Sequence, residues 1–144
     1  MKHKYESGDL FLLPITTGGV ALCQVVSAFK DRFKKVFSFG VLQVSTGDPD
    51  FDLVDRDYLK FKNSRGSEQL IFTSADKLKN GEWAIVGHVP LTPVKNELKY
   101  FRNSYNLYFE DEFLETLDKS KAKEFNVMGV AGFDLVQSYL SQML

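Results

Sequence analysis

The sequence predicts an α+β fold that is mostly β, with a bent antiparallel sheet or small SH3-like barrel and one or two C-terminal helices. Positions 1–93 alternate short apolar runs with Gly, Pro and Asn, which is typical of strands joined by turns. Thirteen phenylalanines and six tyrosines favour a sheet, because aromatic side chains fit a pleated surface. Positions 94–144 become partly helical in their spacing. A chain of 144 residues that is 44% hydrophobic fits a single domain over 1–144.

Three strands are expected in the first third of the chain. The apolar run 9–14 ends at a proline, and a Gly-Gly turn leads into a second apolar run at 20–29, so the two predict a hairpin. The charged stretch 30–35 then turns the chain into a third strand at 36–44. Apolar residues alternate onto both faces of that strand, which indicates a central strand covered on both sides.

Two further strands are expected before the last third of the chain. One is the short run 69–73. The pair Asn80-Gly81 is a strong hairpin signal, and it precedes the strand 83–89, which Pro90 ends. Strict alternation in this strand directs the single tryptophan toward the core.

Two helices are expected near the C-terminus. Val136, Leu140 and Met143 recur at i, i+4 and i+7, so they predict an amphipathic helix over 133–144. Apolar residues on one side of 111–123 predict a helix there as well.

An acidic loop is the first candidate for a functional surface. Its five carboxylates lie within ten residues, and such a negative patch can steer and hold a basic partner; the alternative is a solvated loop. A calcium loop of the EF-hand type is not expected, because its glycine and glutamate positions hold Leu53 and Leu59. A second acidic cluster could extend the patch or favour a helix N-terminus. The candidate partner-binding residues are Asp48, Asp50, Asp52, Asp55, Asp57, Glu110, Asp111 and Glu112.

The sequence carries no signature of an enzyme. The only histidines are His3 and His88, and His88 has no carboxylate at a sequence spacing that would orient it. Cys23 lies in an apolar strand, where a free thiol usually behaves as a small buried hydrophobe. Neither a metal-ligand spacing nor a phosphate-binding loop occurs, so no metal and no cofactor are predicted.

Charge and targeting features point to a cytoplasmic protein without a nucleic-acid or membrane partner. The net charge is −1, and the basic run 30–35 is expected to be a solvated hairpin tip rather than a nucleic-acid contact. A single cysteine suits a reducing compartment, and no apolar segment is long enough to span a membrane.

Two stretches resemble the immunity protein 26 family of bacterial toxin–immunity systems. The first, "YESGDLFLLPITTGGVALCQVV", resembles the family opening through Gly8, Asp9, Phe11, Pro14, Gly18 or Gly19, Ala21, Gln24 and Val25. The second, "GEWAIVGHVPL", resembles its other hallmark through Gly81, Trp83, Ile85, Gly87, His88 and Pro90. The resemblance implies a cytoplasmic protein that binds and neutralises a cognate toxin, such as a nuclease with a basic cleft, without catalysis. It also implies structural roles for Gly8, Asp9, Pro14, Gly81, Trp83, Gly87 and Pro90.

Two other functions remain open from the sequence. A Gly-Asp pair before an apolar strand also resembles the MazF-like small-barrel endoribonucleases, although the arginine-proline pair of their next strand is missing from 20–29. The second of these functions is that of a generic module that binds a peptide or small ligand through surface aromatics. The alternative role of these aromatics is core packing. Those aromatics are Tyr100, Phe101, Tyr105, Tyr108 and Phe109.

Overall fold

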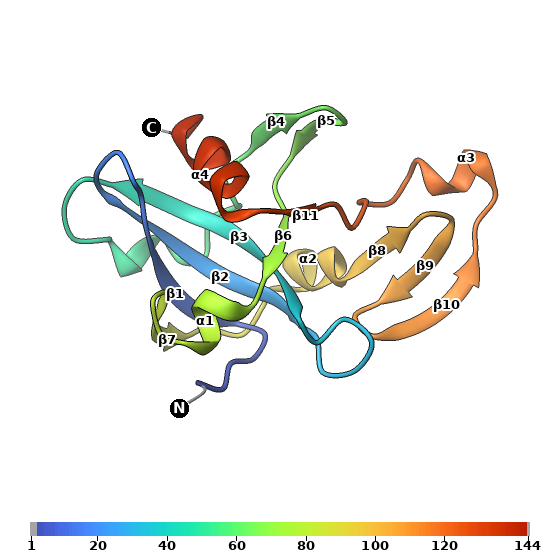
Figure 1. Cartoon of the computed structure of the whole chain (residues 1–144), viewed down its shortest axis with the longest axis horizontal. Coiled ribbons are helices and arrows are strands. Elements are labelled where there is room, and N and C mark those ends of the chain that lie inside the picture. The colour runs from blue at the N-terminus through green and yellow to red at the C-terminus, as the bar shows by residue number, and fades with distance from the viewer. Residues whose placement is uncertain (1–2, 144) are drawn as a thin grey trace.

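A computed structural model describes residues 3–143 of the chain, which are mostly β, with 40% strand and 19% helix over the whole chain. Within these residues the largest sheet has six strands in the order β11-β6-β3-β2-β1-β7 (Figure 1). The strands are β1 (Asp9–Pro14), β2 (Val20–Ala28), β3 (Val36–Ser45), β6 (Ile71–Ser74), β7 (Ala84–His88) and β11 (Val130–Ala131). All neighbours are antiparallel except β11 and β6. The mostly β prediction is confirmed in its open-sheet form, because no barrel closes among the described residues.

The three N-terminal strands form as the apolar runs predict. β1 pairs with β2, and β2 pairs with β3. Gly19 lies in the turn between β1 and β2 with φ +93°, and a Cβ there would lie 2.6 Å from the carbonyl oxygen of Ser45. Glycine is therefore required at this turn.

One face of the large sheet is covered by two helices. The helices are α1 (Asp76–Lys79) and α4 (Phe133–Ser141), and the latter confirms the predicted C-terminal helix. Val136 and Leu140 of α4 are fully buried in the same core as Phe11 and Phe37. Trp83 is 4% exposed, and its ring stacks on Phe11 with the centroids 5.9 Å apart. The tryptophan is thus a core residue, as the alternation predicts.

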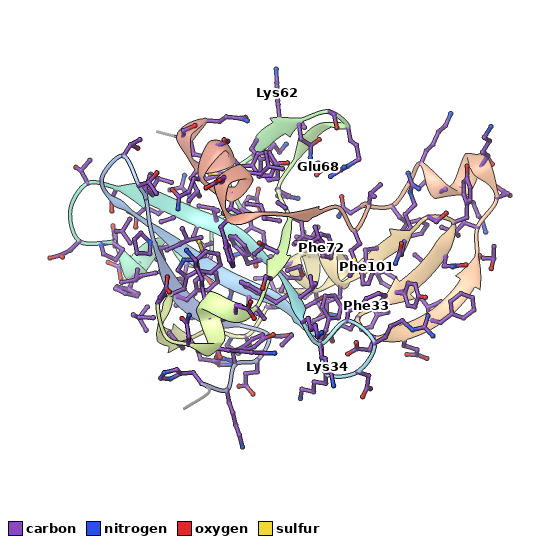
Figure 2. All side chains as sticks on the ribbon, viewed as in Figure 1. Phe33, Lys34, Lys62, Glu68, Phe72 and Phe101 are labelled. Carbon is purple, nitrogen blue, oxygen red and sulfur yellow. The ribbon has the colours of Figure 1, made fainter. Side chains whose placement is uncertain are left out.

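The opposite face is covered by a three-stranded sheet and two short helical turns. These elements are α2 (Pro93–Asn96), η2 (Glu97–Lys99), β8 (Tyr100–Asn103), β9 (Asn106–Phe109) and β10 (Glu112–Thr116). Figure 2 shows Phe33 and Phe72 directed toward Phe101 of β8, with ring centroids 5.6 and 5.4 Å away. Phe101 and Tyr108 are buried in this second core, so core packing is confirmed for these two aromatics.

The remaining elements are short. They are η1 (Phe51–Leu53), β4 (Phe61–Asn63), β5 (Gly66–Glu68) and α3 (Lys119–Ala122). Phe61 of β4 stacks on Tyr139 of α4 with the centroids 4.3 Å apart, which attaches the β4–β5 hairpin to the C-terminal helix. None of the helices in residues 3–143 has the length and apolar character needed to cross a membrane.

The helix predicted over 111–123 is wrong. Residues of this stretch form β10, which pairs with β9, followed by the one-turn helix α3. Phe113 lies opposite Tyr108 in the ladder, with ring centroids 5.7 Å apart. The cross-strand aromatic contact outweighs the weak helical spacing, because pairing and packing decide strand formation more than local pattern does.

The hairpin predicted at Asn80-Gly81 is also wrong. Asn80 follows the last residue of α1, and its backbone N–H donates to the carbonyl oxygen of Asp76, while the N–H of Gly81 donates to that of Leu78. β7 then crosses to pair with β1 at the sheet edge instead of returning along β6. Asn and Gly end helices as readily as they form hairpin turns, so the dipeptide alone does not separate the two.

Candidate functional site

The acidic loop between β3 and β4 presents its carboxylates to solvent. The loop turns at η1, where Asp50 accepts a hydrogen bond at 2.9 Å from the backbone N–H of Asp52. The N–H of Asp50 donates to Oε1 of Gln43 at 2.8 Å, and this ties the turn to the end of β3. The exposed acidic residues of the loop are Asp48, Asp50, Asp52, Asp55 and Asp57.

Tyr58 anchors the end of the acidic loop to the large sheet. It is 3% exposed, and its hydroxyl donates to Oε1 of Gln24 at 2.8 Å. Gln24 in turn donates from Nε2 to the carbonyl oxygen of Val89 at 2.8 Å. A Cβ on Gly40 would lie 2.2 Å from the Tyr58 ring, so glycine at that position of β3 lets the ring lie against the backbone. Burial raises the pKa of Tyr58.

Lys95 of α2 holds the acidic loop from the other side. This lysine is only 5% exposed, and its Nζ donates to the carbonyl oxygen of Val54 at 3.0 Å. The same Nζ lies 4.7 Å from the centre of the Tyr58 ring, a cation–π contact. Burial lowers the pKa of Lys95, while the nearby carboxylates of Asp55 and Asp57 oppose that shift. The loop is therefore fixed at both the backbone and the ring while its carboxylates stay exposed.

The second acidic segment is used largely within the fold. Glu110 forms an ion pair with Nζ of Lys99 at 3.1 Å. The carboxylate of Asp111 accepts backbone hydrogen bonds from Lys30 at 2.8 Å and from Phe33 at 3.4 Å. It therefore shapes the basic hairpin tip 30–35. Glu112 is exposed on β10.

The two acidic segments do not form one continuous patch. The acidic loop follows the end of β3, whereas the β9–β10 turn lies beside the loop that leads into β3, so the two segments are at opposite ends of that strand (Figure 1). A single flat partner contact centred on the loop would therefore not include Glu112.

A histidine–carboxylate cluster lies where β1 begins and β7 ends. The antiparallel register places Asp9 opposite His88, with Oδ1 of Asp9 2.8 Å from Nδ1 of His88. Oε1 of Glu6 lies 3.6 Å from the same nitrogen. The side chains of His88, Asp9 and Glu6 are 42%, 12% and 69% exposed. The expectation that His88 lacks an orienting carboxylate is therefore wrong, because strand pairing supplies a partner 79 residues away.

Gly8 makes this cluster sterically feasible. Its φ is +94°, and a Cβ there would lie 2.6 Å from the carbonyl oxygen of Val89 and 2.9 Å from Cε1 of His88. The backbone of Gly8 also joins β2 to β7, because its N–H donates to Val25 and its carbonyl oxygen accepts from Val89. The Gly8–Asp9 pair thus fixes the approach of β7 to β1.

The remaining motif residues lie at turns and strand ends. Pro14 is the last residue of β1, Pro90 lies just beyond β7, and Gly81 follows α1 with φ +85°. Gly87 lies opposite Leu10 in the β1–β7 ladder. These positions suit the structural roles that the resemblance implies.

The cluster has the chemistry of an oriented imidazole or of metal ligands. With Nδ1 protonated, Asp9 fixes the His88 ring in the way that orients Nε2 as a general base. With Nδ1 unprotonated, that nitrogen and the two carboxylates are instead three potential metal ligands. The nearby hydroxyl of Ser7 donates to the carbonyl oxygen of Val26 at 2.8 Å. Cys23 is fully buried, and burial raises the pKa of its thiol well above the usual value. The inert-thiol interpretation of Cys23 agrees with this environment.

Sequence reasoning did not identify Glu6, Tyr58 or Lys95. Lys95 lies in a stretch with several polar residues, so no local pattern predicts that its side chain is buried. Tyr58 and Gln24 meet only because β2, β3 and the loop pack together. Gln24, a polar residue inside a mostly apolar strand, is the signal that the sequence carries for this contact.

A family model described as Immunity protein 26 matches residues 6–111, well over half of the chain. The match contains the Gly8–Asp9 pair, the acidic loop and the tryptophan strand, and it ends before β10, α3 and α4. No curated protein and no solved structure matches the chain.

Proposed function

This chain belongs to the immunity protein 26 family, and we propose that it binds a cognate bacterial toxin in the cytoplasm and neutralises it without catalysis. The match over residues 6–111 is the observation that carries the proposal. A protein that inhibits by binding needs a rigid scaffold and a complementary surface, and it needs no reactive group. A large sheet with buried cores on both faces supplies such a scaffold.

The acidic loop is the proposed contact surface. Its five aspartates are exposed, while Tyr58 and Lys95 hold its backbone against the sheet. A loop ordered before binding loses little conformational entropy on association. Clustered carboxylates favour a partner with a basic surface and speed its encounter, so a toxin domain with a basic cleft, such as a nuclease, is the class that fits.

The environments of the candidate reactive groups favour inhibition over catalysis. The endoribonuclease alternative implies a small barrel, whereas the sheet within residues 3–143 is open. The Cys23 thiol is buried with a raised pKa, and the Ser7 hydroxyl donates to a backbone carbonyl and not to His88. Both groups are therefore poor nucleophiles.

The contact surface is tested with a triple charge variant, Asp50→Asn, Asp52→Asn and Asp55→Asn. The partner is the toxin domain encoded beside this chain's gene, and the measurements are growth rescue on co-expression and the Kd of the purified pair. Asparagine preserves the cap at Asp50, because its side-chain oxygen also accepts a hydrogen bond. We expect at least about a tenfold weaker Kd, mostly through slower association at low salt, because close charge pairs each contribute about 1.5 kcal/mol or more.

A matched control removes the same charge elsewhere. Glu97→Gln, Glu124→Gln and Asp134→Asn neutralise three exposed carboxylates outside the loop, and the toxin affinity of this variant should stay within about twofold of the parent. Equal affinity of the loop variant and the parent would reject the acidic loop as the contact. Failure of the unmodified chain to rescue growth or to bind would reject the proposed function itself.

A further inference from the structure

The second feature of interest is the cluster of Glu6, Asp9 and His88 at the β1–β7 edge. Each residue offers one ligand atom, and these atoms all lie within 4.8 Å of one another. They come from three separate places in the fold: the segment before β1, the first residue of β1 and the last residue of β7. A mixed set of one imidazole and two carboxylates is a common donor set for first-row divalent ions.

The distances between the donor atoms suit a small ion. Two ligands about 2.1 Å from a tetrahedral Zn²⁺ ion lie about 3.4 Å from each other. Nδ1 of His88 lies 3.6 Å from Oε1 of Glu6, close to that spacing. The distance of 2.8 Å to Oδ1 of Asp9 is shorter, and it needs to open by roughly 0.6 Å, which a half-exposed ring allows.

The central ligand, Asp9, is held in place by the fold. Its Oδ2 accepts the backbone N–H of Glu6 at 2.9 Å, and its backbone N–H donates to the Glu6 carbonyl oxygen at 3.1 Å. This pair of bonds brings the Glu6 side chain next to Asp9. Oδ1 then faces His88, and the glycine at position 8 permits that close approach. Outer hydrogen bonds of this kind fix the orientation of metal ligands.

The site has an entry path and room for further ligands. Beside it lies a pocket of about 360 Å³, lined in part by Glu6, His88 and Asn96. Lys99 also borders the pocket, but its ammonium group is paired with Glu110 at 3.1 Å. Two carboxylates and a neutral imidazole leave the cluster with negative charge that a divalent cation would neutralise. Water or a partner's side chain would complete the coordination from the pocket.

We propose that Glu6, Asp9 and His88 form a binding site for a divalent transition-metal ion, with Zn²⁺ as the representative ion. The bound ion joins the segment before β1 to the edge strand β7. Imidazole favours Zn²⁺ over Mg²⁺, which prefers an all-oxygen, octahedral set. The site shares no residue with the acidic loop, and the inference does not depend on which toxin is bound.

The test is calorimetric titration of Zn²⁺ into the full chain after treatment with a chelator, with Mg²⁺ titrated in parallel. We expect one Zn²⁺ per chain and no measurable Mg²⁺ binding at the same concentrations. Glu6→Gln and His88→Ala should each weaken the Zn²⁺ Kd by at least about tenfold, since even a lost outer hydrogen bond costs about 10–100-fold. Glu6 is 69% exposed, so its variant keeps the fold even if the histidine variant does not.

His3→Ala is the matched control, because His3 is the only other histidine of the chain. This variant should bind Zn²⁺ with the parent's affinity. Three results would overturn the inference: no Zn²⁺ uptake by the parent chain, unchanged affinity in Glu6→Gln, or an equal loss in His3→Ala. Any of them would leave the contact between His88 and Asp9 as a hydrogen bond that fastens the sheet edge.

Discussion

Replacing Tyr58 by phenylalanine tests the anchor of the acidic loop at a single atom. The ring stays, so its contacts with Gly40 and Lys95 persist. The hydroxyl that donates to Oε1 of Gln24 at 2.8 Å is lost. Gln24 is only 1% exposed, so its oxygen is left buried without this donor. A buried acceptor without its partner costs about 1–3 kcal/mol, and we expect the free energy of unfolding to fall by that amount.

Tyr5→Phe is the matched variant, with the opposite expectation. The Tyr5 hydroxyl is buried and has no hydrogen-bond partner within residues 3–143. Its removal therefore leaves no group unpaired, and the free energy of unfolding should stay the same or rise. The comparison isolates the hydrogen bond, because both variants remove one oxygen from a tyrosine ring.

Urea unfolding followed by tryptophan fluorescence measures both variants. Trp83 is the only tryptophan and is 4% exposed, so its emission reports loss of the core. Tyr58→Phe should lower the midpoint without changing the slope. A loss below about 0.5 kcal/mol, the range of neutral surface changes, would refute the role of the hydroxyl. An equal loss in Tyr5→Phe would refute it as well.

Two further predictions concern alkaline pH and the Gly-Asp pair. Burial, with a smaller effect from Asp111, raises the pKa of Tyr5 from 10.0 to about 12. Between these values the unfolded chain has released a proton that the folded chain retains, so the free energy of unfolding falls as pH rises. In urea unfolding at a series of pH values, Tyr5→Phe should show a shallower fall than the parent. An identical dependence on pH would contradict the raised pKa of Tyr5. Gly8→Ala should lower the free energy of unfolding more than Gly18→Ala. Both positions have positive φ, with a strain cost of about 1–3 kcal/mol. Of the two, only Gly8 would place the added Cβ against backbone, 2.6 Å from the carbonyl oxygen of Val89. Equal losses in urea unfolding would contradict the close approach of β7 to this glycine.

The N-terminal strands could be predicted because their signals are local. Each of β1, β2 and β3 is an apolar run bounded by turn residues, and the burial of β3 on both faces follows from its alternation. The helix α4 was predictable for the same reason, since its buried residues repeat at helical spacing.

β10 and the turn at Asn80 could not be assigned from local pattern. Phe113, Leu114 and Leu117 fit one side of a helix, yet Phe113 packs across the ladder on Tyr108. Asn80-Gly81 suits a hairpin turn and a helix end equally. In both places the deciding contact comes from another element, so spacing within the segment carries too little information.

In the candidate sites, too, features set by local sequence could be predicted and features set by contacts with distant segments could not. Exposure of the acidic loop follows from its composition, whereas the roles of Glu110 and Asp111 within the fold depend on Lys99 and the basic hairpin tip. The pairing of Asp9 with His88 is set by the β1–β7 register across 79 residues. A side-chain cluster built by strand register has no signature in sequence spacing.

A titration of the toxin with this chain distinguishes neutralisation by binding from neutralisation by catalysis. A fixed amount of the toxin domain encoded beside this chain's gene is mixed with increasing amounts of the chain, and residual toxin activity is measured. Binding predicts that activity falls linearly to zero at one equivalent and returns when the complex is separated under denaturing conditions and the toxin is refolded. Loss of activity at far less than one equivalent, with the toxin cleaved or modified, would contradict neutralisation by binding, as would full activity in the presence of excess chain.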